Sequence, residues 1–456
     1  MTGPREVVER IWSRDPTLWT GRDEGRWLGW LDEPARMRED VDLLLELADG
    51  VAGDVDDVVL LGMGGSSLAP EVLRRVFGGE RLHVLDTTSP ETIRRLQAEL
   101  DLERTLFLAA SKSGTTLETR SHLDYFWRLA SRGEQWVAIT DPGSPLEQIA
   151  RERRFRATFA GEPTIGGRYS ALSPFGLVPA ALLGVDLARL LERTAEMVEA
   201  CRLADGNPGL ELGLSLGESW RDGRDKVCLP DLHGFGLWAE QLLAESTGKN
   251  GKGLVPAPDE PADGPDRQLQ EVRLPSPYEL GQEFFRWEFG TAVAGSILGI
   301  NPFDQPDVQA AKDKTNEVLE AGDVELEPLG SLDELLASAQ VGDYVCIQAF
   351  VDPTAAAAER LGRLRDRARA ITGCVVTSGF GPRYLHSTGQ LHKGGPNTGV
   401  FVQVVEDYGE ELKIPRKPFG FARLIRAQAA GDFESLRERG RRIVRIHLDD
   451  LDEDFA

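Results

Sequence analysis

The chain has 456 residues, of which 41% are hydrophobic, and a formal net charge of -23. A chain of this length can bury a sizeable core, and we expect two domains or one large two-lobed unit. The negative charge argues against a general surface for nucleic acid or acidic membranes, although a small anionic substrate can still bind in a local basic pocket.

Cysteine spacing and apolar segments bear on the location of the protein. The four cysteines are far apart and show no C-x-x-C spacing, which indicates reduced thiols in a cytoplasmic protein. The first ten residues contain no apolar signal core, and no run of 18 apolar residues occurs anywhere. We therefore expect neither a signal peptide nor a transmembrane helix.

The chain then reads as repeated strand–turn–helix units. Residues 1–50 have a helical pattern and contain four tryptophans, which we interpret as packing anchors. Short apolar strands follow, separated by amphipathic helices, at residues 58–61, 82–85, 105–109, 136–140 and 156–159. A second set of strands is predicted at residues 226–231, 344–351, 374–377, 399–404 and 443–448. This alternation predicts parallel sheets with helices on both faces. Between the two sets, the acidic, proline-rich residues 256–265 predict an exposed loop or flap.

The most informative segment is A-S-K-S-G-T-T-L-E-T, at residues 110–119. It follows a predicted strand and precedes a helical pattern over residues 117–129. A hydroxyl-rich turn that opens a helix presents free backbone N–H groups and a positive helix end, which suits a phosphate. Gly114 lets the backbone approach closely. An ordinary strand-to-helix cap rich in serine and threonine remains the alternative.

Two further turns follow predicted strands, where parallel sheets place their ligands. The turn L-G-M-G-G-S-S, at residues 61–67, permits close backbone approach, and Ser66 can donate to a phosphate or sugar oxygen. It does not match the dinucleotide pattern G-x-G-x-x-G. In I-G-G-R-Y-S, at residues 165–170, Arg168 is placed to stabilise an oxyanion, with a structural ion pair as the alternative.

Three later segments supply candidate acid–base groups. Gln241 and Glu245 lie one helical turn apart, and Glu245 is a candidate general base, although a glutamate near a helix end is usually just a solvated charge. The segment N-P-F-D-Q-P, at residues 301–306, precedes a predicted helix that carries Lys312. Two of the six histidines, His386 and His392, lie in one polar loop, which favours function over packing.

These motifs together resemble the glucose-6-phosphate isomerase (phosphoglucose isomerase) family of sugar-isomerase-domain proteins. They are G-M-G-G-S, S-K-S-G-T-T-L-E-T, G-G-R-Y-S, E-S-T-G-K and N-P-F-D-Q-P-x-V-Q-x-x-K, four of them in the family's order over residues 62–312. The resemblance implies an α/β fold of two α-β-α sandwich sugar-isomerase domains with mainly parallel, flavodoxin-like sheets. The first domain would cover residues 51–200 and the second, with a C-terminal extension, residues 201–456, after a helical segment at 1–50.

The family interconverts glucose 6-phosphate and fructose 6-phosphate without a cofactor or metal. Position by position, the resemblance implies a substrate site formed by Gly65, Ser66, Ser111, Lys112, Ser113, Thr116, Gly167, Gln241 and Gln305. It also implies that Glu245 shuttles the proton between C1 and C2 through a cis-enediol. Arg168 would stabilise the enediolate, and His386, with Lys312, would open the sugar ring.

The chain departs from the family's usual order in one segment. The H-S-T-G-Q segment comes after Lys312 instead of before the F-D-Q motif. Either the second lobe is permuted in sequence or another group opens the ring, and His392 is a rival to His386. In the family, this histidine reaches the site from the second subunit, which implies a homodimer.

The segment Q-L-H-K-G-G-P makes the chain most similar to the isomerase part of transaldolase–isomerase fusions. The 50 residues before the first strand are too few for a transaldolase barrel. The resemblance therefore implies a free-standing form or an excised half, with a transaldolase as a possible fusion or partner. Three alternatives to a plain glucose-6-phosphate isomerase remain: one that also accepts mannose 6-phosphate, a non-catalytic sugar-phosphate sensor, and a dinucleotide-dependent enzyme.

Overall fold

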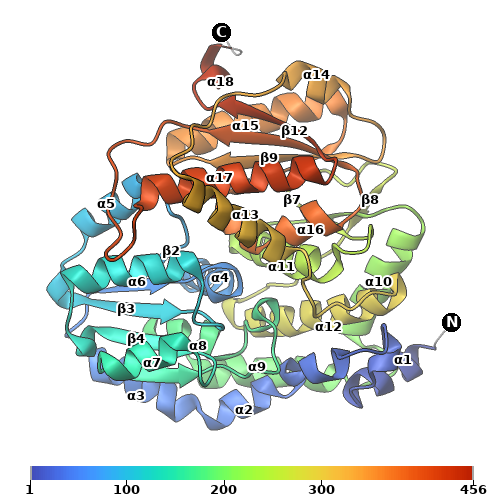
Figure 1. Ribbon diagram of the computed structural model, residues 1–456. Coiled ribbons are helices and arrows are strands. Elements are labelled where there is room, and N and C mark those ends of the chain that lie inside the picture. The colour runs from blue at the N-terminus through green and yellow to red at the C-terminus, as the bar shows by residue number, and fades with distance from the viewer. Residues whose placement is uncertain (1–2, 454–456) are drawn as a thin grey trace.

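The computed structural model describes residues 3–453 and has a first lobe built on one five-stranded sheet (Figure 1). All strands in this sheet are parallel, in the order β2-β1-β3-β4-β5. Their bounds are β1 Asp57–Leu61, β2 Leu82–Leu85, β3 Thr105–Ala110, β4 Trp136–Thr140 and β5 Ala157–Ala160. The five strands predicted from the apolar pattern are confirmed, with ends that differ by one residue at most.

Helices cover this sheet on both faces because successive strand residues point to opposite sides. Val58 and Leu60 of β1 pack in one apolar cluster, whereas Val59 and Leu61 pack in another. The first cluster includes residues of α3 (Val41–Val51), α4 (Leu68–Phe77) and α8 (Pro174–Leu182). The second includes residues of α5 (Pro90–Glu99), α6 (Leu117–Leu129) and α7 (Pro145–Glu152). The expected doubly covered parallel sheet is confirmed.

The second lobe contains two further parallel sheets. One has the order β10-β9-β11-β12, with β9 Tyr344–Phe350, β10 Val375–Phe380, β11 Gly399–Val405 and β12 Arg442–His447. The helices α14 (Leu332–Ala337) and α15 (Ala355–Thr372) lie on its upper side in Figure 1. On the opposite side lie α13 (Val308–Ala321), α16 (Gly389–Gly394) and α17 (Phe421–Glu438), which face the first lobe (Figure 1).

The smaller sheet corrects one expectation. Its order is β7-β6-β8, with β6 Lys226–Leu229, β7 Val255–Pro258 and β8 Arg267–Leu269. The expectation of an exposed flap from residue 256 onward is wrong at β7, whose first three residues are buried. The prolines at 256 and 258 are tolerated because β7 is hydrogen-bonded to β6 alone, so a missing N–H costs no ladder bond on its other side.

The largest apolar cluster crosses the expected boundary near residue 200. It extends from α1 (Pro4–Trp12) to α12 (Leu280–Leu298) and includes α10 (Pro208–Arg221). The two helices α10 and α12 approach closely, since a Cβ atom at Gly213 would lie 2.4 Å from the Cβ of Val293. The sheets themselves lie on either side of residue 200, but the division into two domains there stays a prediction.

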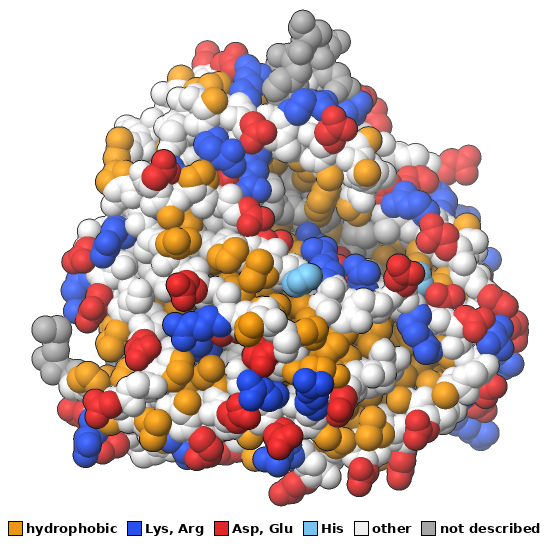
Figure 2. Space-filling model, turned by 180° about the vertical axis from the view of Figure 1, so that it is seen from behind, with side chains coloured by type: hydrophobic (Ala, Val, Ile, Leu, Met, Phe, Trp, Pro, Cys, Tyr) orange, Lys and Arg blue, Asp and Glu red, His pale blue; other side chains and the backbone are white. Residues whose placement is uncertain are grey.

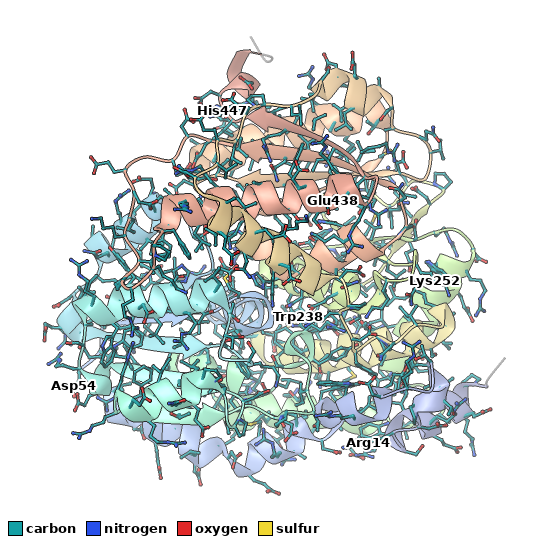
Figure 3. The ribbon with its side chains drawn as sticks, in the orientation of Figure 1. Arg14, Asp54, Trp238, Lys252, Glu438 and His447 are labelled. Atoms are coloured by element: carbon teal, nitrogen blue, oxygen red, sulfur yellow. The ribbon has the colours of Figure 1, made fainter. Side chains whose placement is uncertain are left out.

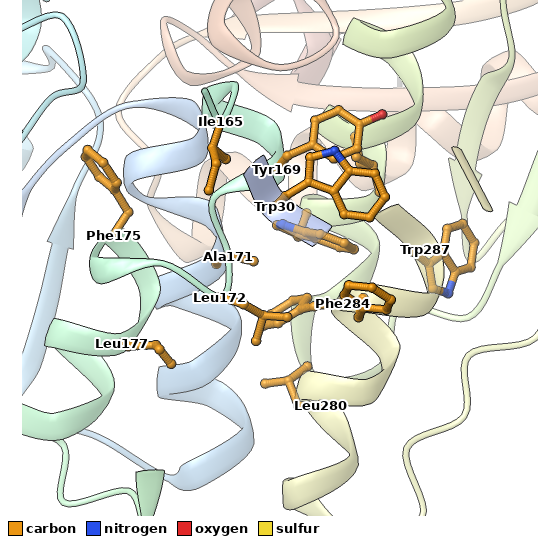
Figure 4. Close-up of a cluster of buried hydrophobic side chains, with 14 of the residues drawn as sticks. Trp30, Ile165, Tyr169, Ala171, Leu172, Phe175, Leu177, Leu280, Phe284 and Trp287 are labelled. Atoms are coloured by element: carbon orange, nitrogen blue, oxygen red, sulfur yellow. The ribbon is translucent and has the colours of Figure 1, made fainter. Parts of the chain in front are cut away.

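The tryptophans near the N-terminus are packing anchors, as expected. The indole N–H of Trp12 donates to the carbonyl of Cys201, and that of Trp19 donates to the carbonyl of Ala292. Figure 4 shows the Trp30 ring lying against the Tyr169 ring, with a centroid distance of 5.4 Å. Because Tyr169 adjoins Arg168 in the chain, this packing supports the turn that carries Arg168.

Most charged side chains lie on the surface of the molecule, and most large apolar side chains lie in its interior. Figure 3 places Trp238 near the middle of the molecule, whereas Arg14 and Asp54 lie at its edge. Acidic and basic side chains are interspersed over the face in Figure 2, which is hollowed near its centre. Among the helices in residues 3–453, none is long and apolar enough to cross a lipid bilayer.

Candidate active site

Arg168 is the buried cation around which the candidate residues gather. It lies in a short 3-10 turn, Gly167–Tyr169, and its side chain is only 2% exposed. Its Nε donates to Ser246 Oγ at 2.8 Å, and its Nη2 donates to the carbonyl oxygens of Pro302 at 2.7 Å and Asp304 at 3.0 Å. These bonds fix the plane of the guanidinium group, and they leave Nη1 directed toward acidic and amide oxygens.

Glu245 is the acidic partner of Arg168. Its Oε1 lies 3.3 Å from Arg168 Nη1, and its Oε2 accepts a hydrogen bond of 3.0 Å from Gln241 Nε2. Both side chains project from one face of α11 (Phe235–Thr247), which confirms the spacing argument. The Glu245 carboxylate is thus largely buried and held at both oxygens, so it is not a solvated surface charge.

Lys249 brings the E-S-T-G-K and N-P-F-D-Q segments together. Its ammonium group donates to the carbonyl of Asn301 at 2.8 Å and pairs with Asp304 Oδ1 at 2.7 Å. Burial, aided by the charge of Arg168, lowers the pKa of Lys249 to about 8. Gln305 follows directly, is exposed, and accepts a long hydrogen bond of 3.5 Å from Arg168 Nη1. Gln305, which the resemblance places in the substrate site, therefore lies beside Arg168 in the structure.

The two glycine-rich turns pack against each other. A Cβ atom at Gly65 would lie 2.0 Å from the carbonyl oxygen of Gly167, so no side chain fits there. A Cβ at Gly64 would lie 2.6 Å from the carbonyl oxygen of His386. Ser66 follows in the same turn and is buried. Three motifs far apart in the chain therefore meet at this point.

The turn between β3 and α6 has the geometry of an anion site. Gly114 adopts a φ of +66°, and its N–H donates to Ser111 Oγ at 3.1 Å. Ser111 Oγ and Thr116 Oγ1 lie 2.9 Å apart. Thr116 immediately precedes α6 without capping it through its side chain, which leaves the first amides of the helix available to a ligand. Ser113 is exposed beside them.

The Lys112 side chain is bonded to two neighbouring segments of the first lobe. Its ammonium group pairs with Asp141 Oδ1 at 2.7 Å and donates to the carbonyl of Glu162 at 2.9 Å. The ammonium therefore has two partners within the protein, and the place of Lys112 in a phosphate cradle stays a prediction. The backbone amide of Lys112 is the group that this position can offer to an anion.

A cavity of about 340 Å³ opens beside the N-terminus of α6. Its lining consists of Thr115, Thr116, Leu117, Glu118, Lys312, Thr315, Asn316, Leu385, His386 and Gln428. The cavity thus unites the candidate anion turn with both candidate ring-opening groups. Glu245 is not part of this lining, but Gln241 links the two regions because its Nε2 also donates to the backbone carbonyl of His386 at 2.9 Å.

Glu118 is a site residue to which the sequence analysis gave no role. His386 Nε2 lies 2.9 Å from Glu118 Oε1, which also accepts from Gln428 Nε2 at 2.7 Å. Burial raises the pKa of the Glu118 carboxyl, but the His386 imidazole beside it more than offsets this and brings the pKa to about 2. In the sequence, the only indication of a role for Glu118 is that it lies within the motif S-K-S-G-T-T-L-E-T.

His392 lies outside the cavity. It is 2% exposed, with its Nδ1 3.2 Å from Gln348 Nε2 and its Nε2 3.5 Å from Cys346 Sγ. Burial holds the pKa of His392 well below its ordinary value, so its imidazole is neutral. Of the two rival histidines, the geometry favours His386.

His386 reaches the cavity from the same chain that supplies Glu118. The expected route, from a second subunit, is not needed for this contact. The loop bearing His386 follows β10 in the chain, and the carbonyl oxygen of His386 lies against Gly64 of the first lobe.

Comparisons with known proteins find similarity to the same family that the sequence motifs resemble. Residues 44–220 match the phosphoglucose isomerase family model. A glucose-6-phosphate isomerase of Thermus thermophilus is 43% identical over 180 residues, which cover 37% of this chain and 42% of that protein. One from Rubrobacter xylanophilus is 28% identical over 375 residues, which cover 61% of this chain and 86% of that protein. The chain therefore spans less than half the length of the Thermus relative that it matches.

A solved structure supports the fold. The crystal structure of a glucose-6-phosphate isomerase from Chlamydia trachomatis aligns with a TM-score of 0.58 and 19% identity, and the alignment covers 70% of this chain and 84% of that one. At this level of identity, the likeness shows a shared fold alone.

The Glu118–His386 pair predicts an acid-dependent part of the stability. An unfolded glutamate has a pKa of about 4.3, above the folded value, so the unfolded state binds the proton first as the pH falls. The contribution is fully present above about pH 5 and is lost as the pH falls from there toward 2. Glu118→Gln should therefore lower the free energy of unfolding at pH 7 by on the order of 2–3 kcal/mol and flatten its decline between pH 5 and pH 3. Urea unfolding at four pH values measures this, and parallel curves for both proteins would contradict it.

Proposed function

We propose that this chain, which is related to the phosphoglucose isomerases, interconverts glucose 6-phosphate and fructose 6-phosphate. The observation that carries the proposal is the buried Arg168–Glu245 pair, with the carboxylate also held by Gln241. Aldose–ketose exchange requires one base to move a proton between adjacent carbons and one cation beside the oxygen that becomes negative. The pair supplies both.

In the proposed reaction, Glu245 removes the proton from one of the carbons C1 and C2 and returns it to the other, through a cis-enediol. Arg168 stabilises the enediolate oxygen with a cation that is already oriented by Ser246 and two carbonyl groups. Since those bonds exist before the substrate binds, little reorganisation is required as the charge develops. The unpartnered Oε1 of Gln241, which is buried, is an acceptor for a substrate hydroxyl group.

Ring opening is assigned to His386, with Lys312 as its partner across the cavity. Opening requires one proton to leave the anomeric hydroxyl and another to reach the ring oxygen. Glu118 supports this role because its contact with Nε2 orients the imidazole ring. The phosphate is assigned to the turn before α6, with Ser66, Ser111, Ser113, Thr116 and the backbone of Lys112 as ligands. Gly65, Gly167 and Gln305 complete the substrate site.

A homodimer and a cytoplasmic location belong to the same proposal. The family resemblance supports the first, and the four free, buried cysteines support the second. Association with a transaldolase is proposed on the Q-L-H-K-G-G-P segment alone.

A coupled assay tests the activity directly. The chain should form glucose 6-phosphate from fructose 6-phosphate, detected by NADP reduction with glucose-6-phosphate dehydrogenase. Glu245→Gln should lower kcat by about 10²- to 10⁴-fold, since general base catalysis contributes that much, while calorimetric binding of fructose 6-phosphate persists. Glu211→Gln, an exposed glutamate of α10, is the matched control. A wild-type chain that binds fructose 6-phosphate without turnover would identify a sensor instead.

The phosphate turn makes a second prediction. Ser111→Ala and Thr116→Ala should each weaken the binding of fructose 6-phosphate by about 1.5–3 kcal/mol, the range for a hydrogen bond to a charged group. The binding of unphosphorylated fructose should barely change. Calorimetric titration with both sugars measures the difference. Equal losses for both sugars would show that the turn contacts the sugar ring or acts structurally.

A further inference from the structure

Gln390 is a buried amide that the proposed reaction does not use. It lies in α16, four residues after His386, and is 0% exposed. Its Nε2 donates to the carbonyl oxygen of Gly248 at 2.8 Å and to Asp307 Oδ2 at 2.8 Å. Its Oε1 accepts from the backbone N–H of Asp307 at 3.0 Å. One side chain is therefore bonded to two segments that lie 142 and 83 residues away in sequence.

Each bonded segment carries a group assigned to the reaction. Gly248 follows Glu245 by three residues, at the end of α11. Asp307 precedes α13, the helix that carries Lys312. Gln390 itself belongs to the loop of His386. The amide thus joins the base, the lysine and the histidine through short stretches of backbone.

The space around the Gln390 amide is closely packed. A Cβ atom at Gly394 would lie 2.3 Å from Asp307 Oδ2, 2.7 Å from Gln390 Nε2 and 2.8 Å from the carbonyl oxygen of Gly248. The amide nitrogen of Gln390 and its two acceptors therefore converge on the space that a side chain at 394 would occupy. Arg439 pairs with the other oxygen of Asp307 at 2.9 Å, which fixes the rotation of the carboxylate.

Only an amide satisfies the three partners. Glutamine has both the donors and the acceptor that the site uses. A carboxylate at 390 has no donor for Gly248 and would face the carboxylate of Asp307. An aliphatic side chain would leave the buried carbonyl of Gly248 and the half-buried N–H of Asp307 without this partner, which is costly.

We propose that Gln390 is the positioning residue that sets Glu245, Lys312 and His386 at fixed separations. The inference rests on the proposed isomerase function, since it concerns the groups assigned to that reaction. Ring opening and proton transfer act on adjacent parts of one bound sugar, so the groups for both steps must fit the same substrate position. A displacement of about 1 Å between catalytic groups costs about 10²-fold in rate.

The test compares two buried glutamines. Gln390→Leu should lower kcat for fructose 6-phosphate by about 10²-fold, with a much smaller change in KM. Gln403→Leu is the matched control: Gln403 lies in β11, is also 0% exposed, and has two comparable bonds, to the carbonyl of Ala429 and from Arg445. It should lose similar stability in urea unfolding but keep kcat. Equal kcat losses in the two variants would overturn the positioning role.

A rescue variant separates positioning from general destabilisation. Gln390→Glu alone should be as impaired as Gln390→Leu. In the double variant Gln390→Glu/Asp307→Asn, position 307 carries the donor and position 390 carries the acceptor. Part of kcat should therefore return. If the double variant is no more active than Gln390→Glu, the pairing with Asp307 does not set the geometry.

Amide hydrogen exchange tests the link independently of activity. In Gln390→Leu, exchange should accelerate at residues 246–250 and 312–316 but not in β1 or β3. Unchanged exchange in both segments would refute the inference whether or not the chain is an isomerase. An inactive wild-type chain whose Gln390→Leu variant still shows faster exchange would refute the proposed function and leave the link intact.

Discussion

The buried guanidinium group of Arg168 is the constraint on which the site depends. A cation with 2% exposure is tolerated only when hydrogen bonds and an opposite charge replace the water it has lost. Those replacements come from Ser246 and Glu245 on α11 and from the carbonyls of Pro302 and Asp304. The Arg168 charge therefore requires α11 and residues 302–304, which are far apart in sequence, to lie against the turn that carries Arg168. A lysine cannot make this set of contacts, because it lacks the planar fork of donors.

In the proposed reaction, this arrangement would separate proton transfer from ring opening within one site. The carboxylate of Glu245 lies beside the guanidinium group of Arg168, whereas His386 lines the cavity and is held there by Glu118. Gln241 contacts both sides, through the Glu245 carboxylate and the His386 carbonyl. A sugar phosphate anchored at the turn before α6 would present its ring to one side and its first two carbons to the other. The distance between these groups then decides whether both steps act on one bound substrate.

The sequence predicted what depends on local patterns. Strand β3 and helix α6 were found because an apolar run and a helical period meet at a turn of small hydroxylated residues. Strand β7 was missed because Pro256 and Pro258 argue against a strand unless it lies at a sheet edge, which only pairing reveals. The partner of the Lys112 ammonium and the contact between Glu118 and His386 were missed for a similar reason. The latter pair lies 268 residues apart, and no local pattern encodes such a contact. The resemblance implied candidate roles for the residues, and the cavity lining, which includes His386 but not His392, favours His386.

Hydrogen exchange on an open-chain substrate distinguishes the proposed base, Glu245, from the proposed ring opener, His386. The substrate 5-deoxyfructose 6-phosphate has no hydroxyl group that can close a five-membered ring, so it needs no opening step. In D₂O, the His386→Ala variant should exchange the C1 hydrogen of this analogue at a rate close to that of the wild-type protein, while its turnover of fructose 6-phosphate falls by about 10²-fold or more. The Glu245→Gln variant should lose both activities. Loss of exchange in His386→Ala, or normal exchange in Glu245→Gln, would contradict these two assignments.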